Sequence, residues 1–363
     1  MKGKKLTLLL FFLLLTCLAV HLYSRNETRV EKDYSNGFFP GFAAILRGIF
    51  GKIPISIGDI LYGLAVAWLL WKAGKWLWRL IKRNKTEPVP RNPWLITAGK
   101  ILLIASIIYI IFNVFWGINY NRKGISWQLG LKMGEYSKEE LVEMNRLLVQ
   151  KININKETLI QKNRAYPSNR EMFGMVTEAY KKAARQYPFL DCSPPSLKSS
   201  MWGWLGNYTG FTGYYNPFTG EAQVNTSIPK FLQPFVACHE VAHQVGYAKE
   251  MEANFVGYLA AAHSGNELLQ YSVYLDLFVY ANRNLFYADS AAAKDCRKGL
   301  LPQVHDDLKV WLKFSREHES FIEPVVRWMY GMYLRGNRQP SGIASYDEVT
   351  GFIIAYYRKF GGI

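Results

Sequence analysis

The sequence predicts a mostly helical α+β protein in which three amino-terminal transmembrane helices are followed by one larger domain. Three long apolar runs occupy the first third of the 363-residue chain, and helical periodicity dominates most of the remainder. One short stretch, residues 207–225, combines Tyr, Phe and Thr with Gly, Asn and Pro, which is typical of strands and turns. We therefore expect a membrane anchor over residues 1–118 and a domain over residues 119–363, which at about 245 residues can build one substantial core.

The apolar runs cover residues 6–23, 55–71 and 94–116. Each is about long enough to cross a hydrocarbon core of roughly 30 Å. The first run also fits a cleaved secretory signal, but no small-x-small cleavage site follows it before Arg25, which favours an uncleaved anchor. The second run is the shortest and has Asp59 as its only charge, so a buried core helix is the alternative interpretation there.

Charge predicts the orientation of the anchor. The link between the second and third runs contains Lys72, Lys75, Arg79, Lys82, Arg83, Lys85 and Arg91 against the single acidic residue Glu87. Such a basic link belongs on the cytoplasmic side, as do the lysines at the amino terminus. We therefore expect an integral membrane protein with residues 119–363 on the extracytoplasmic side.

The composition of the chain indicates which kind of binding partner to expect. The formal net charge is +16 and the pI about 9.5, but the basic residues are spread along the chain without a recognisable nucleic-acid motif, so the lipid bilayer is the expected partner and nucleic acid is not. Four cysteines are too few for a disulfide framework. The sequence leaves open whether Cys192 and Cys296 form one disulfide bond. We expect Cys238 to be a core residue. Nothing indicates an oligomeric state.

The most specific motif is His239-Glu240-Val241-Ala242-His243. On a helix, residues four apart share a face, so both imidazoles can reach one Zn²⁺ while Glu240 points at a water molecule on the metal. Zinc lowers the pKa of such a water to roughly 7, and a neighbouring carboxylate can act as the general base. The alternative is a pair of satisfied histidines in the core.

A third metal ligand is expected shortly downstream. Gly246 can end the helix and turn the chain back beneath the metal. The run Glu250-Met251-Glu252-Ala253-Asn254 then resembles the Glu-x-x-Ala-Asp/Asn element of gluzincins. In that register Glu250 is the ligand and Asn254 supports a ligand histidine from outside. Glu252 is the alternative third ligand.

Residues 207–225 are expected to form a hairpin followed by a strand through Ala222, Gln223 and Val224. In zincins an edge strand above the active-site helix can pair with an extended peptide substrate. Simple packing of the hairpin on the helix is the alternative. Further helices are expected over residues 138–150, 170–186, 253–263, 268–285, 308–316, 321–333 and 346–360, with a loop over residues 334–345.

Together, the three spans and the segments NPFTGEAQVN, HEVAHQVGYAKEMEANF and GNRQPSGIASYDEV resemble the bacterial membrane family known as domain of unknown function 3810. That family resembles gluzincin-type zinc metallopeptidases. The resemblance implies a location in a bacterial inner (cytoplasmic) membrane and a zincin-like domain, with His239, Glu240 and His243 as its reactive centre. The substrate is expected from the motif itself: a zinc-activated water attacks a carbonyl group, which indicates amide hydrolysis and hence a peptide or protein substrate. An oxyanion-stabilising group would come from elsewhere, and the candidates are Tyr214, Tyr215, Tyr271 and Arg283. The competing interpretation is a non-catalytic envelope protein that uses the same fold, with a structural zinc, for interactions.

The predicted orientation can be tested with reporters fused after Ile363. Because the basic link should remain in the cytoplasm, a reporter that is active only in the periplasm should work, and one that is active only in the cytoplasm should not. The reverse pattern would overturn the topology.

Overall fold

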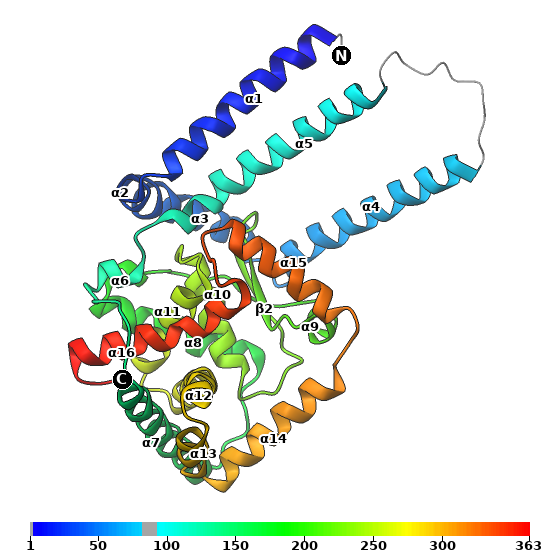
Figure 1. Cartoon of the computed structure of the whole chain (residues 1–363). Coiled ribbons are helices and arrows are strands. Elements are labelled where there is room, and N and C mark those ends of the chain that lie inside the picture. Colours follow the sequence, from blue (N-terminus) through cyan, green and yellow to red (C-terminus); the bar gives the residue numbers. More distant parts are fainter. Residues whose placement is uncertain (1–2, 82–92) are drawn as a thin grey trace.

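The three apolar runs form long helices that project from one end of the remaining chain (Figure 1). In the computed structural model, which describes residues 3–81 and 93–363, these helices are α1 (Gly3–Ser24), α4 (Ile57–Ile81) and α5 (Pro93–Phe115). Each contains a stretch long and apolar enough to cross a membrane, namely Leu6–Ser24, Ile57–Arg79 and Thr97–Phe115. These lengths and compositions support membrane association.

The second span is longer than the sequence pattern indicates and is not a core helix. Helix α4 continues ten residues beyond Trp71, because the basic residues that follow are good helix formers and no proline interrupts them. Only 11% of its most apolar window is buried. The predicted orientation stays a prediction, and Lys2, Lys82, Arg83, Lys85, Glu87 and Arg91, on which it partly depends, lie outside the described residues.

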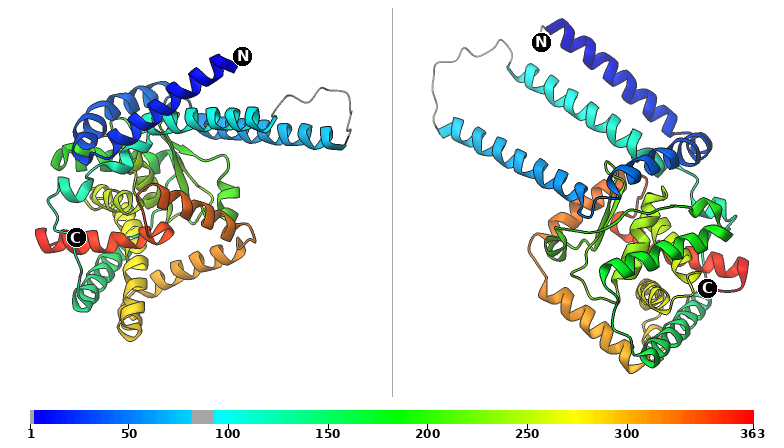
Figure 2. Two further views of the ribbon diagram at one scale, coloured as in Figure 1. Left: turned by 45° about the horizontal axis from the view of Figure 1, so that its top comes forward. Right: turned by 180° about the vertical axis from the view of Figure 1, so that it is seen from behind.

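The three spans are not equally packed. Helix α1 lies along α5, and the Cys17 thiol approaches the Ser106 carbonyl at 3.7 Å. Among the described residues, α4 makes no comparable packing contact with α1 or α5. Figures 1 and 2 show the same separation from both sides. The spans therefore form a pair and a lone helix.

The segment between the first two spans folds onto the domain. It forms α2 (Glu27–Arg29), the π-helix η1 (Val30–Phe38) and α3 (Phe39–Phe50). These helices build a small second core, whose buried members are Val30, Tyr34, Phe39, Ala43, Trp116, Ile118, Tyr120 and Ala248. The membrane-proximal segment thus shares apolar packing with the start of the domain, including the turn that follows the His239-to-His243 motif.

A buried ion pair reinforces this contact. The Arg122 guanidinium donates to both Glu31 carboxylate oxygens, at 2.8 and 3.1 Å, and both side chains are almost fully buried. Arg122 also donates to the Gly246 carbonyl at 3.2 Å and lies over the Tyr247 ring. Burial would raise the pKa of Glu31, but Arg122 outweighs it and holds that pKa below its ordinary value.

The domain is a helical assembly around one large core. Its main helices are α7 (Lys138–Lys162), α8 (Asn169–Gln186), α10 (Gln233–Gln244), α11 (Glu250–Ala262), α12 (Glu267–Ala288), α13 (Ser290–Lys298), α14 (Pro302–Glu317), α15 (Glu323–Gly336) and α16 (Val349–Phe360). Shorter elements are η2 (Gly117–Asn121), α6 (Ile125–Gln128), η3 (Pro188–Leu190), α9 (Gly203–Thr209) and η4 (Gly342–Glu348). Helices α7 and α8 begin at capping boxes, in which Ser137 pairs with Glu140 and Ser168 with Glu171.

The only sheet among the described residues has three strands in the order β1-β3-β2. They are β1 (Leu197–Ser199), β2 (Gly213–Asn216) and β3 (Glu221–Val224). Strand β3 is parallel to β1 and antiparallel to β2, with Gly213 opposite Val224 and Asn216 opposite Glu221. This confirms the expected hairpin and the strand through Ala222, Gln223 and Val224. Strand β2 is left at the edge of the sheet.

The hairpin also holds the first turn of α4. The buried Glu221 carboxylate accepts hydrogen bonds from the amides of Ile57 and Gly58, at 3.2 and 2.7 Å, and so caps the helix with a negative charge. Asp59, the only acidic residue of the span, accepts from the Met201 amide at 2.6 Å and from the Tyr214 hydroxyl. The base of the lone span is therefore fastened to the sheet.

Several details differ from the sequence-based expectations. The helix expected over residues 138–150 runs on to Lys162, and the helix expected from residue 346 is preceded by the 3₁₀ turn η4, which shortens the expected loop. Helices α2, α3, α6, α9 and α13 were not expected, and α9 takes up the first residues of the stretch 207–225 in which the hairpin was expected. Cys192 and Cys296 are free thiols, so the disulfide that the sequence left open is not formed. Cys238 is a fully buried core residue, as expected.

Replacing Arg122 should destabilise the protein, because it leaves the Glu31 carboxylate buried without its partner. We expect Arg122→Met to cost about 3–5 kcal/mol, and the double variant Glu31→Met, Arg122→Met to recover much of that loss. The measurement is thermal unfolding of the full chain in detergent.

The matched control is Arg338→Met, which breaks an Arg–Glu pair to Glu27 whose partners are 41% and 55% exposed. It should cost less than about 1 kcal/mol. Equal melting of the two arginine variants would show that the Glu31–Arg122 pair does not join the segments.

Candidate metal centre

Helix α10 carries His239 and His243 one turn apart on the same face, as the sequence predicts. Their ring centroids are 4.7 Å apart, and both side chains are buried. The opposite face is apolar and fully buried, with Ala237, Cys238, Val241 and Ala242 in the main core. Because core packing orients this helix, both imidazoles are aimed at one point.

A tight turn brings the next helix back to the histidines. Gly246 has φ +99°, a conformation that favours glycine, and a Cβ there would lie 3.1 Å from the Phe39 ring. Helix α11 then begins at Glu250, whose Oε2 lies 3.2 Å from His239 Nε2 and 3.6 Å from His243 Nε2. One ligand atom from each of these three residues lies within 4.8 Å of the others. The short gap after His243 is therefore compatible with a three-residue ligand set.

The other ring nitrogens have oxygen partners. His239 Nδ1 lies 2.7 Å from the Asn254 side-chain oxygen, and His243 Nδ1 lies 2.7 Å from the Tyr247 carbonyl oxygen. Since both oxygens only accept, each Nδ1 carries a hydrogen, which leaves the Nε2 lone pair free in a neutral imidazole. Asn254 thus occupies the supporting position that the sequence assigned to it.

Two residues from the carboxyl-terminal part of the chain hold Glu250. The Tyr330 hydroxyl donates to Glu250 Oε1 at 2.6 Å, and the Glu250 amide donates to the Gln339 side chain at 2.9 Å. Glu250 Oε2, by contrast, has no hydrogen-bond partner of good geometry among the described residues. Burial would raise the pKa of Glu250, but the imidazoles of His239 and His243 outweigh it and keep that pKa low. Glu250 is thus held as an ionised carboxylate whose Oε2 is not engaged in a hydrogen bond of good geometry with a described residue.

Glu240 lies beside the three ligands and is also buried. One of its oxygens, Oε2, has no hydrogen-bond partner among the described residues. Burial raises the pKa of Glu240 to about 7, although His239 and His243 act in the opposite direction. A Cβ on Gly213 of strand β2 would lie 2.6 Å from Glu240 Oε1, so the lack of a side chain there lets the strand approach this carboxylate.

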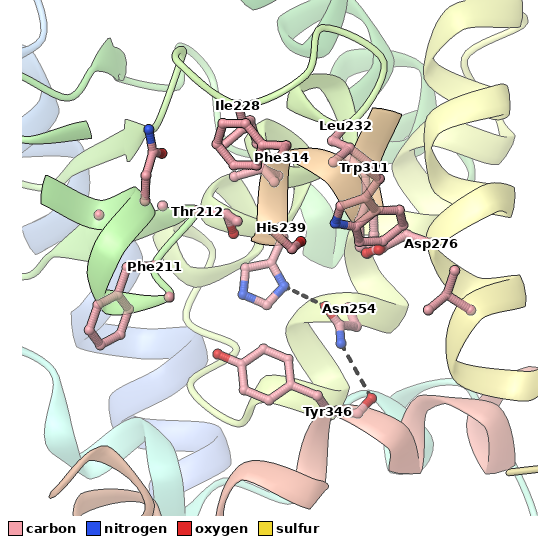
Figure 3. A pocket seen from close by; sticks show the side chains of 18 of the residues that line it. Phe211, Thr212, Ile228, Leu232, His239, Asn254, Asp276, Trp311, Phe314 and Tyr346 are labelled. Carbon is pink, nitrogen blue, oxygen red and sulfur yellow. Dashed lines mark hydrogen bonds between the residues drawn. The ribbon is translucent and has the colours of Figure 1, made fainter. Parts of the chain in front are cut away.

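Two cavities meet at these residues. The first has a volume of about 420 Å³ and is lined by His239, Glu240 and Asn254. It extends between α12, α14 and α15 to Asp276, Arg283, Glu323 and Arg327. Figure 3 shows it from close by, with His239 hydrogen-bonded to Asn254 and with Tyr346 beneath them. We call it the distal cavity. The second, of about 410 Å³, contains Glu240 and all three candidate ligands, and its wall includes Tyr62 of α4 and Phe112 of α5. We call it the span-side cavity.

A family model described as "Protein of unknown function (DUF3810)" matches residues 34–354. The chain belongs to this family. The matched region includes the spans α4 and α5, the sheet and every residue of the metal centre, so the expected family is confirmed. No curated protein and no solved structure matches this DUF3810 chain, and the resemblance to gluzincin peptidases therefore rests on the residues of the site.

The donors of this DUF3810 site fit a metal ion better than an internal hydrogen-bond network. Two imidazole Nε2 atoms and one carboxylate oxygen face each other, and among the described residues that oxygen accepts no hydrogen bond of good geometry. Burial lowers the pKa of His243, but Glu250 outweighs it and raises that pKa to about 9. A buried carboxylate oxygen without such a bond is costly unless a cation neutralises it. Two histidines and one glutamate form a ligand set typical of catalytic zinc, and the triad supplies three ligands rather than four.

The alternative third ligand, Glu252, points elsewhere. A Cβ on Gly124 would lie 1.8 Å from Glu252 Oε1, which places that carboxylate against the chain beside Arg122 rather than beside the histidines. Burial raises the pKa of Glu252 above its ordinary value. Glu252 is therefore not part of the ligand cluster.

The proposed oxyanion candidates are not brought together at the metal centre. Tyr271 donates to Asp307 outside both cavities, and Arg283 pairs with Asp347 in the wall of the distal cavity. Tyr214 and Tyr215 line the span-side cavity, where Tyr214 donates to Asp59 and Tyr215 packs on Trp116.

Sequence reasoning missed Tyr330, Gln339 and Tyr346. The Tyr346 ring is nearly parallel to His239, with centroids 6.2 Å apart, and it lines both cavities. The segment GNRQPSGIASYDEV, which carried part of the family resemblance, contains both Gln339 and Tyr346. This family resemblance was the only indication in the sequence that the segment matters for the site. The local pattern of residues gives no sign that a loop near Gln339 contacts the motif around His239, which lies about a hundred residues earlier.

Measured zinc affinity should distinguish the three ligand residues from the residues around them. Substituting His239, His243 or Glu250 by Ala removes one of three donors, so each variant should lose at least about tenfold in zinc affinity, and Asn254→Ala should lose less. Glu240→Gln and Glu252→Ala should bind like the wild type. The measurement is calorimetric titration of the metal-stripped full chain with Zn²⁺, and wild-type affinity in both histidine variants would end the metal hypothesis.

Proposed function

We propose that this DUF3810 protein is a membrane-anchored zinc-dependent peptidase whose domain lies on the extracytoplasmic side of a bacterial inner membrane. The observation that carries the proposal is the convergence of His239, His243 and Glu250, with Glu240 beside them and two cavities leading to the same point. A three-ligand set with an adjacent free carboxylate is the arrangement of hydrolytic rather than structural zinc sites.

The chain supplies the proton-handling group. When bound, zinc would lower the pKa of water to roughly 7 and polarise a carbonyl group. Glu240 would accept the proton of the attacking water and pass it to the leaving amine, so one carboxylate acts first as base and then as acid. Glu240 is buried beside the proposed ligands and its Oε2 has no hydrogen-bond partner among the described residues, so the carboxylate is free for both roles. Asn254 and Tyr247 would keep the two histidines in the tautomer that binds metal.

Strand β2 offers a backbone edge for an extended substrate. The Ala222 amide and the Val224 carbonyl bond toward the β1 side, and the Asn225 amide donates to the Thr212 carbonyl. Peptide groups alternate along an antiparallel pair, so those of Gly213 and Tyr215 face away from β3. A peptide that adds to this edge would pass directly over Glu240, which supports a polypeptide substrate.

Tyr346 is our candidate for the oxyanion-stabilising group. Its ring lies against His239 at the junction of the two cavities, and its hydroxyl lies beside Tyr330 and Glu250. A phenol at that position could donate to the developing negative charge on the substrate oxygen.

Hydrolysis should depend on Glu240 and Tyr346 in different ways from metal binding. With a mass-spectrometric peptide-library assay, Glu240→Gln should reduce cleavage at least about a hundredfold while zinc content is unchanged. Tyr346→Phe should reduce kcat by about 10²-fold. Tyr287→Phe, at an 82% exposed tyrosine, is the matched control and should be silent.

If the wild-type protein binds zinc but cleaves no member of the library, the competing interpretation gains support. The chain would then be a non-catalytic membrane protein that uses the same zinc site for structure and interactions.

A further inference from the structure

The span-side cavity joins the metal centre to two membrane-spanning helices. Its wall contains His239, Glu240, His243 and Glu250, and the same wall contains Tyr62 of α4 and Phe112 of α5. Tyr62 lies five residues beyond the start of α4, about 7–8 Å along the helix axis. Phe112 lies in the last turn of α5. The cavity thus reaches the level at which these helices enter the bilayer.

Aromatic side chains dominate this cavity. Besides Tyr62 and Phe112 they are Trp116, Tyr120, Phe211, Tyr214, Tyr215, Phe218, Tyr330, Tyr333 and Tyr346. Tyrosine and tryptophan favour the boundary between hydrocarbon and water, where one part of the ring is apolar and another can hydrogen-bond. The distal cavity is different, because its wall includes the ionisable side chains of Asp276, Arg283, Glu323 and Arg327. One end of the cleft suits the membrane boundary, and the other suits a polar chain.

The arrangement of the spans leaves this cavity approachable from the bilayer. Helix α1 packs along α5, whereas α4 has no comparable packing contact with either among the described residues. The large apolar side chains of α4 are correspondingly exposed, including Leu61, Leu64, Val66, Trp68, Leu69 and Leu70. The base of α4 is nevertheless held to the sheet through Glu221 and Asp59. The separation between α4 and α5 is therefore a fixed feature at the domain surface (Figure 2).

Strand β2 runs between the same two places. At one end, a Cβ on Gly213 would touch the Glu240 carboxylate. At the other end, the Asn216 side chain lies against Gly58 in the first turn of α4, where an added Cβ would be 2.6 Å from Asn216 Nδ2. A chain that pairs with the open edge of β2 would therefore extend from the base of a span to the catalytic carboxylate.

We propose that the substrate is a polypeptide anchored in the same bilayer, and that it is cleaved in the extracytoplasmic stretch next to its own membrane helix. This inference rests on the proposed peptidase function and adds the class of its substrate. The substrate helix would lie in lipid beside α4 and α5, the adjoining residues would enter the aromatic cavity, and the following residues would pass β2 and Glu240 toward the distal cavity. Three to five extended residues span about 10–17 Å, so cleavage should fall within about ten residues of the helix.

The test uses the full-length, zinc-loaded protein in lipid vesicles. One randomised peptide library is offered in three forms: free in solution, fused directly to a 20-residue Leu/Ala helix, and fused to that helix through a long Gly/Ser spacer. Helices at either end of the library are included, because the strand edge accepts both chain directions. The directly fused library should be cut at least about tenfold faster than the spacer form, which shares its surface concentration, and the cuts should cluster near the helix.

Two variants of α4 test the route. Tyr62→Arg places a charge in the cavity wall and should reduce cleavage of the directly fused library at least about tenfold. Leu61→Arg adds the same charge at the same depth on a residue that does not line the cavity, and it should cleave the fused library like the wild type.

Cross-linking gives a readout that does not depend on hydrolysis. In the Glu240→Gln protein, a photoreactive residue placed directly after the anchor helix should cross-link to peptides containing Tyr62 or Phe112. Cross-links confined to α1, or equal cleavage of all three libraries at evenly spread sites, would overturn the inference while leaving the peptidase intact. Cross-links at Tyr62 without cleavage of any library would instead refute the peptidase and keep the membrane-side binding.

Discussion

The close approach of α10 and α11 is the constraint on which the site depends. A Cβ on Gly257 would lie 3.1 Å from the His239 amide nitrogen, so the two helices can meet this closely only where α11 has no side chain. At that separation Glu250 and Asn254, one turn apart on α11, both face the histidines of α10. A wider spacing would separate the carboxylate from the imidazoles, and neither helix would have a partner for its buried polar groups. The site is therefore inseparable from the packing of the core.

The groups around the metal centre come from distant parts of the chain. Tyr330 on α15 holds one oxygen of Glu250, Gln339 holds its amide, and Tyr346 covers His239. Tyr330 satisfies Oε1 of Glu250, while Oε2, which faces the two histidines, has no hydrogen-bond partner of good geometry among the described residues. A buried site of this kind needs such support, because an imidazole or carboxylate that can rotate does not hold three donors at one point.

The membrane anchor is part of the structure of the site rather than a tether. Arg122 connects the segment after the first span to the Gly246 carbonyl, and the next carbonyl, that of Tyr247, holds His243. On the other side, Glu221 and Asp59 fasten α4 to the hairpin whose edge faces Glu240. Segments next to the spans thus contact both walls of the cleft. A domain that acts on substrates in the bilayer would need this fixed relation between spans and site.

The sequence by itself determined the features that depend on local pattern. Three apolar runs specified three long helices, strand-forming residues mixed with turn residues specified the hairpin, and a five-residue motif placed two histidines on one helical face. The roles of Glu250 and Asn254 were also predicted, from the resemblance of residues 250–254 to the Glu-x-x-Ala-Asp/Asn element, although the helix that carries them begins three residues earlier than expected. Helix ends were less accurate at residues 71 and 150, since good helix formers continue beyond the apolar pattern.

Only the tertiary structure decided which distant groups complete the site. Glu250 and Glu252 are the same residue type only two positions apart. The direction of α11 points Glu250 at the histidines and Glu252 at Gly124. Tyr330, Gln339 and Tyr346 are ordinary residues of a helix and a loop until the fold brings them to α11. The pairing of α1 with α5, the isolation of α4 and the cavity between span and sheet are likewise absent from the sequence pattern. They arise from contacts between segments far apart in the chain, which local periodicity does not encode.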